Sequence, residues 1–166
     1  SLNGQKKEIH RKAELTELMS NICDSVFSMT PVISNEAVNR DEITSIASNS
    51  RNKIITGLLR NELEKNLGLS GSGQEVSIMR STLIRTGIWD DTAEKPSSFN
   101  LRPQNPQIAN MLSTIEQFIV SARRNGSIGF DVLYDMLTLP EYHIGLRKGL
   151  IPIYLAAVIH EYKQQV

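Results

Sequence analysis

The chain has 166 residues, of which 40% are hydrophobic, so it is long enough to bury a core as a single domain. Its 18 Lys and Arg residues balance its 18 Asp and Glu residues, which excludes a strongly basic nucleic-acid-binding chain. One cysteine, Cys23, excludes a disulfide framework and a cysteine-based zinc site. No apolar run is long enough to cross a membrane and no signal-peptide pattern opens the chain. We therefore expect a soluble, cytoplasmic, globular domain.

The first predicted element is a helix from about Ile9 to Phe27. Its apolar residues recur at spacings of three and four, which is typical of one helical stripe. Cys23 falls within this stripe, where we expect it to be buried as a small hydrophobic side chain. Pro31 ends the helix, because the residue before a proline is disfavoured in the helical region.

The middle of the chain predicts two further helices. Asp41 is a suitable N-cap for a helix that should extend to about Asn66, since its carboxylate can accept hydrogen bonds from free backbone amides. Ser72 and Glu75 have the spacing of a capping box, which predicts the start of another helix. That helix should end near Gly87.

A polar stretch over residues 89–105 is the longest segment without helical periodicity. Its Pro, Ser, Asn and Asp residues indicate a mobile loop or a linker. Asn105 and Pro106 then form a favourable helix start, with Asn as the cap and Pro in the first helical position. We expect this helix to close at Asn125 and Gly126.

The last forty residues predict a helix, a turn and a second helix. The first of these helices begins near Phe130 and ends before Pro140, and the second covers about 147–163. The second helix is apolar on nearly every side, which predicts burial. Strand signals are confined to short pieces such as residues 127–130.

These elements predict an all-α fold, a bundle of six or seven helices with a helix-turn-helix-like or winged-helix-like C-terminal part. We expect a single helical domain over residues 5–166. Within it, residues 5–88 form the N-terminal half, 89–105 the loop and 106–166 the C-terminal half.

The residue patterns typical of catalytic sites are incomplete in this sequence. The glycine-rich segment 68–73 precedes a predicted helix, but Gln74 and Glu75 follow it where a Walker loop needs Lys and Ser or Thr. His10, His143 and His160 show no metal-ligand spacing on one helix. We therefore predict no catalytic residue, no metal site and no cofactor, and do not expect an enzyme.

Binding to nucleic acid is the alternative to a protein-interaction role. A helix-turn-helix can be drawn over residues 130–162, with Arg147 and Lys148 at the start of its second helix, where recognition residues normally lie. That helix is too apolar to enter a DNA groove with many hydrogen-bond donors. Nucleic acid therefore remains a candidate partner that we do not favour.

Two stretches have a familiar pattern: residues 30–40 (TPVISNEAVNR), leading into SRNKII at 50–55, and residues 142–154 (YHIGLRKGLIPIY), with LGLSGSGQE at 67–75 between them. Their order resembles a helical region of very large bacterial P-loop ATPases, some of which belong to anti-phage systems of the BREX type. The resemblance implies that this chain is part of a longer ATP-binding protein. Walker motifs are absent, so it assigns no ATP-binding residue here.

Within those two stretches we predict an interaction surface. Asn35, Glu36, Asn39 and Arg40 crowd hydrogen-bonding groups into one connector, where they either tie two helices together or face a neighbouring domain. In the other stretch, Gly145 and Gly149 flank Arg147 and Lys148 at a helix start, a setting that suits a phosphate or a partner's carboxylate. We expect a non-catalytic structural or interaction module, whose partners are other domains of the parent protein.

Overall fold

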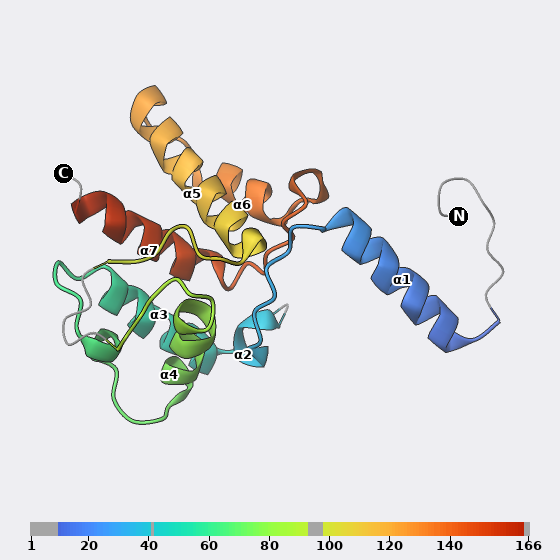
Figure 1. Cartoon of the computed structure of the whole chain (residues 1–166), viewed down its shortest axis with the longest axis horizontal. Coiled ribbons are helices and arrows are strands. Elements are labelled where there is room, and N and C mark those ends of the chain that lie inside the picture. The colour runs from blue at the N-terminus through green and yellow to red at the C-terminus, as the bar shows by residue number, and fades with distance from the viewer. Residues whose placement is uncertain (1–9, 41, 93–97, 165–166) are drawn as a thin grey trace.

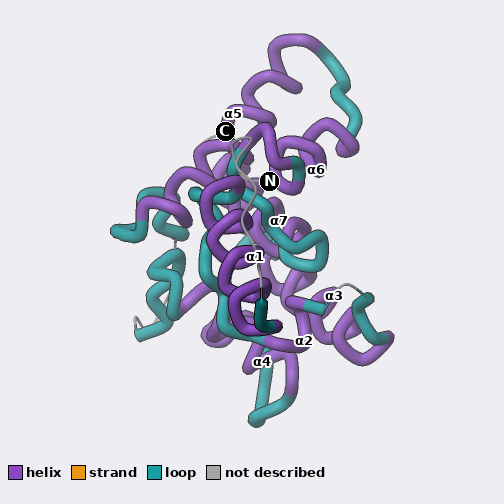
Figure 2. The backbone as a smooth tube through the Cα atoms, turned by 90° about the vertical axis from the view of Figure 1, so that its right-hand side faces the viewer, coloured by secondary structure: helices purple, strands orange, loops and turns teal. Residues whose placement is uncertain are grey.

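The computed structural model describes residues 10–40, 42–92 and 98–164 of the chain. Its described residues form helices and loops without a strand, which confirms the all-α prediction; the weak strand signal at 127–130 forms no strand (Figure 2). Seven α-helices are described: α1 Lys12–Val26, α2 Glu36–Asn39, α3 Ser45–Leu58, α4 Gln74–Met79, α5 Pro106–Asn125, α6 Phe130–Thr138 and α7 Ile151–Gln164. Shorter helical segments are the 3₁₀ turns Lys65–Gly68 and Pro140–Tyr142 and the π-helix Arg80–Ile84.

The centre of the fold is α7, which lies between α3 and α5 and contacts both (Figure 1). Its side chains are apolar around most of the helix, and a helix of that kind is stable only when it is enclosed. Pro152 stands in its first turn, where a missing backbone N–H costs no hydrogen bond. Seven residues of this helix are buried: Ile151, Ile153, Tyr154, Ala156, Ala157, Val158 and His160.

The end of α3 differs from the prediction. The helix stops at Leu58, well before Asn66, and the chain returns through a 3₁₀ turn in which Asn66 and Leu67 have positive φ. This path inserts Leu67 into the core directly against Gly57. A Cβ atom on Gly57 would lie 2.7 Å from the Leu67 Cβ and 2.8 Å from its carbonyl oxygen. Packing of a leucine against a glycine therefore overrides the local helical pattern.

Two predicted helix caps in this region have different outcomes. Asp41 lies outside the described residues, and the N-cap of α3 is Thr44, whose hydroxyl accepts a hydrogen bond from the Ala47 N–H at 3.2 Å. The prediction of a capping box at Ser72 and Glu75 is wrong, because the N-cap of α4 is Gly73, and no side chain donates or accepts a capping hydrogen bond there. Glu75 instead accepts a hydrogen bond from Lys53 of α3 at 2.8 Å.

The polar stretch 89–105 is irregular where it is described, but its ends are packed. Trp89 and Phe99 are buried, with ring centroids 6.0 Å apart. Phe99 also meets the His160 ring of α7 edge-on at 5.4 Å. At the end of the stretch the Asn105 side chain accepts from the Ile108 N–H at 3.0 Å, which confirms the cap of α5. Aromatic burial thus fixes the described ends of this loop to α7.

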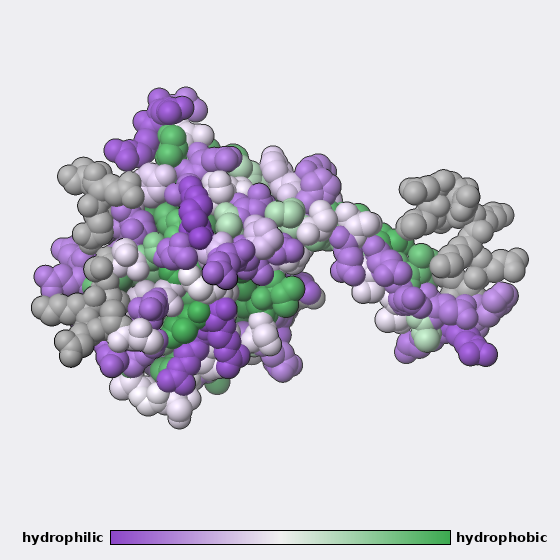
Figure 3. Space-filling view, in the orientation of Figure 1, coloured by the Kyte–Doolittle hydropathy of each residue, from purple (hydrophilic) through white to green (hydrophobic). Residues whose placement is uncertain are grey.

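In contrast to the other long helices, α1 projects away from the helical core (Figure 1). None of its fifteen residues is buried, although the predicted apolar stripe is present. Cys23 is exposed, so the expectation that it packs as a small core residue is wrong. The hydrophobic surface on this arm is visible in Figure 3. The amphipathic pattern predicted the helix correctly but not its environment.

Candidate binding cleft at the base of the projecting helix

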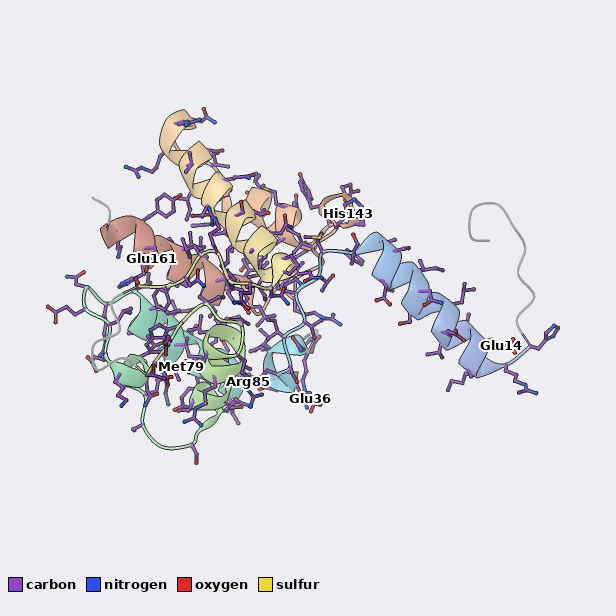
Figure 4. The ribbon with its side chains drawn as sticks, in the orientation of Figure 1. Glu14, Glu36, Met79, Arg85, His143 and Glu161 are labelled. Carbon is purple, nitrogen blue, oxygen red and sulfur yellow. The ribbon has the colours of Figure 1, made fainter. Side chains whose placement is uncertain are left out.

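The C-terminal end of α1 is fixed to the loop before α7. Nδ1 of His143 lies 2.7 Å from the Val26 carbonyl oxygen and, because a carbonyl only accepts, this nitrogen donates the hydrogen bond. The Met29 N–H donates to the His143 carbonyl oxygen at 3.0 Å. Figure 4 shows His143 beside the base of α1. Two hydrogen bonds therefore join segments that are more than a hundred residues apart.

Close backbone approach strengthens this junction. Gly145 has a φ of +59°, and a Cβ there would lie 2.5 Å from the Phe27 ring. Gly149 lies against Ile43 and the Val38 carbonyl oxygen, so it also leaves no room for a side chain. The prediction that these two glycines allow close backbone approach is confirmed.

Of the predicted surface residues, Asn35 and Asn39 hold the connector together. The Asn35 side chain accepts from the Ala37 N–H at 3.1 Å and donates to the Ser81 hydroxyl at 3.0 Å. The Asn39 amide donates to the Ile33 carbonyl at 2.6 Å. Asn35 therefore ties α2 to the π-helix Arg80–Ile84, one of the two roles left open by the sequence, and Asn39 fixes α2 to its own connector.

Glu36 and Arg40 lie instead on the surface, as an ion pair across one turn of helix with an N–O distance of 3.3 Å. Their side chains are 86% and 56% exposed, so water screens the pair and its contribution to stability is small. Both charges therefore remain able to exchange partners. Glu36 is labelled on this exposed face in Figure 4.

Arg40 and four residues of the second predicted stretch line one cleft of about 1000 Å³ at the base of α1. The four residues from the turn before α7 are Gly145, Arg147, Lys148 and Gly149. Asn35 and Glu36 line a separate hollow of about 520 Å³, to which Arg40 also contributes. The structure thus gathers five of the eight predicted surface residues into one concave site.

Arg51 is the residue of this cleft that sequence reasoning missed. It lies on α3 and lines the same cavity as Arg40 and Lys148. Its terminal nitrogen donates to the Ser48 hydroxyl at 3.4 Å, while its Nε is buried without a hydrogen-bond partner. In the sequence Arg51 belongs to the SRNKII segment of the resemblance and to the basic residues scattered among acids, but neither observation assigned it to a binding surface.

Three titratable groups outside the cleft have shifted pKa values, and each shift has a structural cause. The Lys53 hydrogen bond lowers the pKa of Glu75, and the Thr92 side chain and backbone lower the pKa of Asp90. Burial raises the pKa of Tyr154, whose hydroxyl lies in the core without a hydrogen-bond partner among the described residues. None of these groups lines the cleft, so they do not supply it with an acid or a base.

His160, the most buried of the three histidines, also has a structural contact. Its Nδ1 lies 2.9 Å from the Leu58 carbonyl oxygen, so the ring closes the end of α3 against α7. Among the described residues, no group of three His, Cys, Asp or Glu side chains is placed to hold a metal ion. The same part of the chain contains no helix with the length and apolarity needed to span a membrane.

The comparisons with known proteins add no family to this description. No protein-family model matches the chain, and neither a curated protein nor a solved structure is significantly similar to it. What can be argued about its function therefore comes from the projecting helix, the cleft and the residues that form them.

Proposed function

We propose that this chain is a non-catalytic interaction module of a larger cytoplasmic ATP-binding protein, and that α1 docks against another domain of that protein. The observation that carries the proposal is the apolar stripe of α1, which no part of the described structure covers. Leu15 and Met19 on this stripe are 46% and 52% exposed. A helix of fifteen residues is marginal alone in water, so a partner that covers the stripe would stabilise it.

The geometry of α1 suits docking. Its apolar residues lie at positions 15, 18, 19, 22 and 26, which is the spacing by which an amphipathic helix fills an apolar groove. Its C-terminal end is held by the His143 hydrogen bonds, so the helix leaves the core in a defined direction. A docked partner would therefore be coupled mechanically to the loop before α7.

The side chains that catalysis would need have other contacts in this fold. His143 and His160 each bind a backbone carbonyl, and the exposed Cys23 lines the cleft, whose described lining includes no histidine to act as its base. These contacts favour a binding role over an enzymatic one.

Membership of a larger ATP-binding protein rests on the sequence resemblance. The two stretches that carry it, 30–40 and 142–154, meet at the base of α1, where Arg40 and Lys148 line the same cleft. Their contact supports a shared role for the two stretches. It assigns no nucleotide site to this chain.

The docking proposal can be tested with a photo-crosslinking amino acid at position 19 in cells that make the protein. We expect an adduct with another part of the parent protein, identified by mass spectrometry, and its loss when Leu18→Asp is added. The matched control places the crosslinker at Ser20, which is exposed and lies off the apolar stripe on the polar face of α1. Equal adducts from both positions, or none from position 19, would contradict the proposal.

Sedimentation of the purified chain separates this proposal from self-association. We expect a monomer, because in this proposal the apolar stripe of α1 binds a different domain and not a second copy of the chain. A dimer that Leu18→Asp converts to a monomer would show that a second copy covers α1, and docking onto another domain would then be wrong.

A nucleic-acid-binding module is the second candidate, and the basic residues of the cleft are the observation that favours it. Against it, α7, the expected recognition helix, is the buried centre of the fold. A titration with duplex DNA at several salt concentrations distinguishes the two candidates. Binding tighter than about 10⁻⁵ M that weakens steeply with salt would support phosphate contacts.

A further inference from the structure

The cleft at the base of α1 is built by segments from the whole length of the chain. Its walls come from the end of α1, the end of α2, α3, α6 and the turn 145–149 before α7. Its volume of about 1000 Å³ is at the upper end of the range of small-molecule sites. Since these segments are fixed by the core and by the His143 hydrogen bonds, the cleft is largely formed before any ligand arrives.

Charge is distributed unequally in this cleft. Arg40, Arg51, Arg147 and Lys148 line it, whereas Asp24 is the one carboxylate among its described lining residues. The chain as a whole has no net charge, so this gathering of basic side chains around one cleft is a product of folding. Like charges gathered around a concave surface attract an anion.

Two of these cations are available to a ligand. Lys148 is exposed and has no ion-pair partner within the described parts of the chain. Arg40 pairs, among the residues that the structure describes, with the exposed Glu36, and water screens this pair, so a more highly charged ligand would displace Glu36.

Arg51 supplies an independent indication of a ligand. Its Nε is buried and has no hydrogen-bond partner, although buried donors in proteins are almost always paired. An oxygen atom of a bound anion, reaching from the cleft that Arg51 lines, would satisfy this donor. Arginine presents its donors as a planar fork, which matches the oxygens of a phosphoryl group.

The side chains that form the walls of the cleft further limit the chemical class of the ligand. Several basic side chains around one cleft fit a multiply charged anion better than a single carboxylate. Phe27, Val32 and Ile43 provide an apolar wall beside the basic residues, with room for an organic moiety. We propose that this cleft binds a small molecule that carries a diphosphate or similar multiply charged phosphoryl group.

The first experiment is a calorimetric titration of the whole chain with inorganic pyrophosphate. We expect saturable binding to one site that weakens as salt is added. The double variant R40Q/K148Q should weaken it about tenfold or more, because two charge-assisted contacts are lost. Both residues are exposed, so the variant should keep the fold, which a thermal melt checks.

The matched control is R123Q/R124Q. It removes the same charge from two exposed residues near the end of α5 that do not line the cleft. We expect this control to bind pyrophosphate as the unmodified chain does. Equal weakening in both double variants would show non-specific charge attraction, and absence of saturable binding would overturn the proposal.

Two further probes identify the ligand chemistry. Citrate carries similar charge without phosphorus, so citrate binding as tight as pyrophosphate binding would overturn the preference for phosphoryl groups. If a short DNA duplex binds more tightly than pyrophosphate, and this binding is lost in R40Q/K148Q, the ligand of the cleft is nucleic acid and the small-molecule proposal is wrong. The α1 variant Met19→Asp should leave pyrophosphate binding unchanged, so failure of this proposal is distinguishable from failure of helix docking.

Discussion

The helices α1 and α7 are similar in length, with 15 and 14 residues, but they occupy opposite environments. The α7 helix is apolar on most faces and is enclosed by α3 and α5, whereas α1 has one apolar stripe and no buried residue. Periodicity predicted a helix in both cases. It did not predict what covers each apolar surface, and in α1 that uncovered surface became the basis of the proposed function.

The largest expected difference between the two helices is in stability. Ile153→Ala in α7 removes a fully buried side chain from the core and should lower the free energy of unfolding by about 2–5 kcal/mol. Leu18→Ala in α1 should change it by less than about 0.5 kcal/mol, because Leu18 packs against no core residue. Urea denaturation of both variants measures the contrast. A similar loss in each would mean that α1 is packed in solution.

The next largest effect tests the close packing that ends α3. Gly57→Ala places a Cβ against the Leu67 backbone and should destabilise the fold by about 1–3 kcal/mol. The control is Gly73→Ala at the start of α4, whose Cβ would lie nearest to the carboxylate end of the Glu75 side chain, which can rotate away more easily than the Leu67 backbone can move. Thermal or urea unfolding distinguishes them, and an unaffected Gly57→Ala protein would show that Leu67 is not held against α3.

A smaller effect of opposite sign is expected inside α7. The Tyr154 hydroxyl is buried and lacks a hydrogen-bond partner, so its desolvation is not compensated. Tyr154→Phe should leave stability unchanged or raise it by about 1–2 kcal/mol. Clear destabilisation in urea would indicate that the hydroxyl has a partner, such as a bound water molecule.

The smallest expected effect depends on pH. The Lys53 hydrogen bond lowers the pKa of Glu75 below its ordinary value of 4.5, so the ion pair stabilises the fold above that pH. This contribution disappears as the pH falls through the lowered pKa. Glu75→Gln should therefore be slightly less stable than the unmodified protein at neutral pH and equally stable in strong acid. Thermal melts from neutral pH to strong acid measure this. A difference in melting temperature between the two proteins that stays the same at every pH would contradict the assignment.

Local signals in the sequence were reliable where they depended on backbone chemistry alone. Asn105 caps α5, Pro106 occupies its first turn, and α6 ends before Pro140 as predicted. Such signals work because the cap and the proline act within one turn of the residue concerned. The capping box at Ser72 and Glu75 failed, because a lysine on another helix offered Glu75 a charged partner.

The candidate site was only partly predictable. Arg40, Arg147 and Lys148 drew attention because each stands in an unusual local context of asparagines or glycines. Arg51 did not, since its role comes from the packing of α3 beside the turn before α7. Whether a basic residue faces a shared cleft is a property of the tertiary structure.

By itself, the sequence determined an all-α chain and the approximate positions of its longer helices, because apolar spacing and capping act over a few residues. Tertiary structure decided that α7 is enclosed, that α1 is left uncovered, and that four cations meet in one cleft. Those outcomes depend on contacts between segments more than a hundred residues apart, such as the hydrogen bond from His143 to Val26. Local patterns cannot specify such contacts, because the same amphipathic helix is stable against its own core or against a partner.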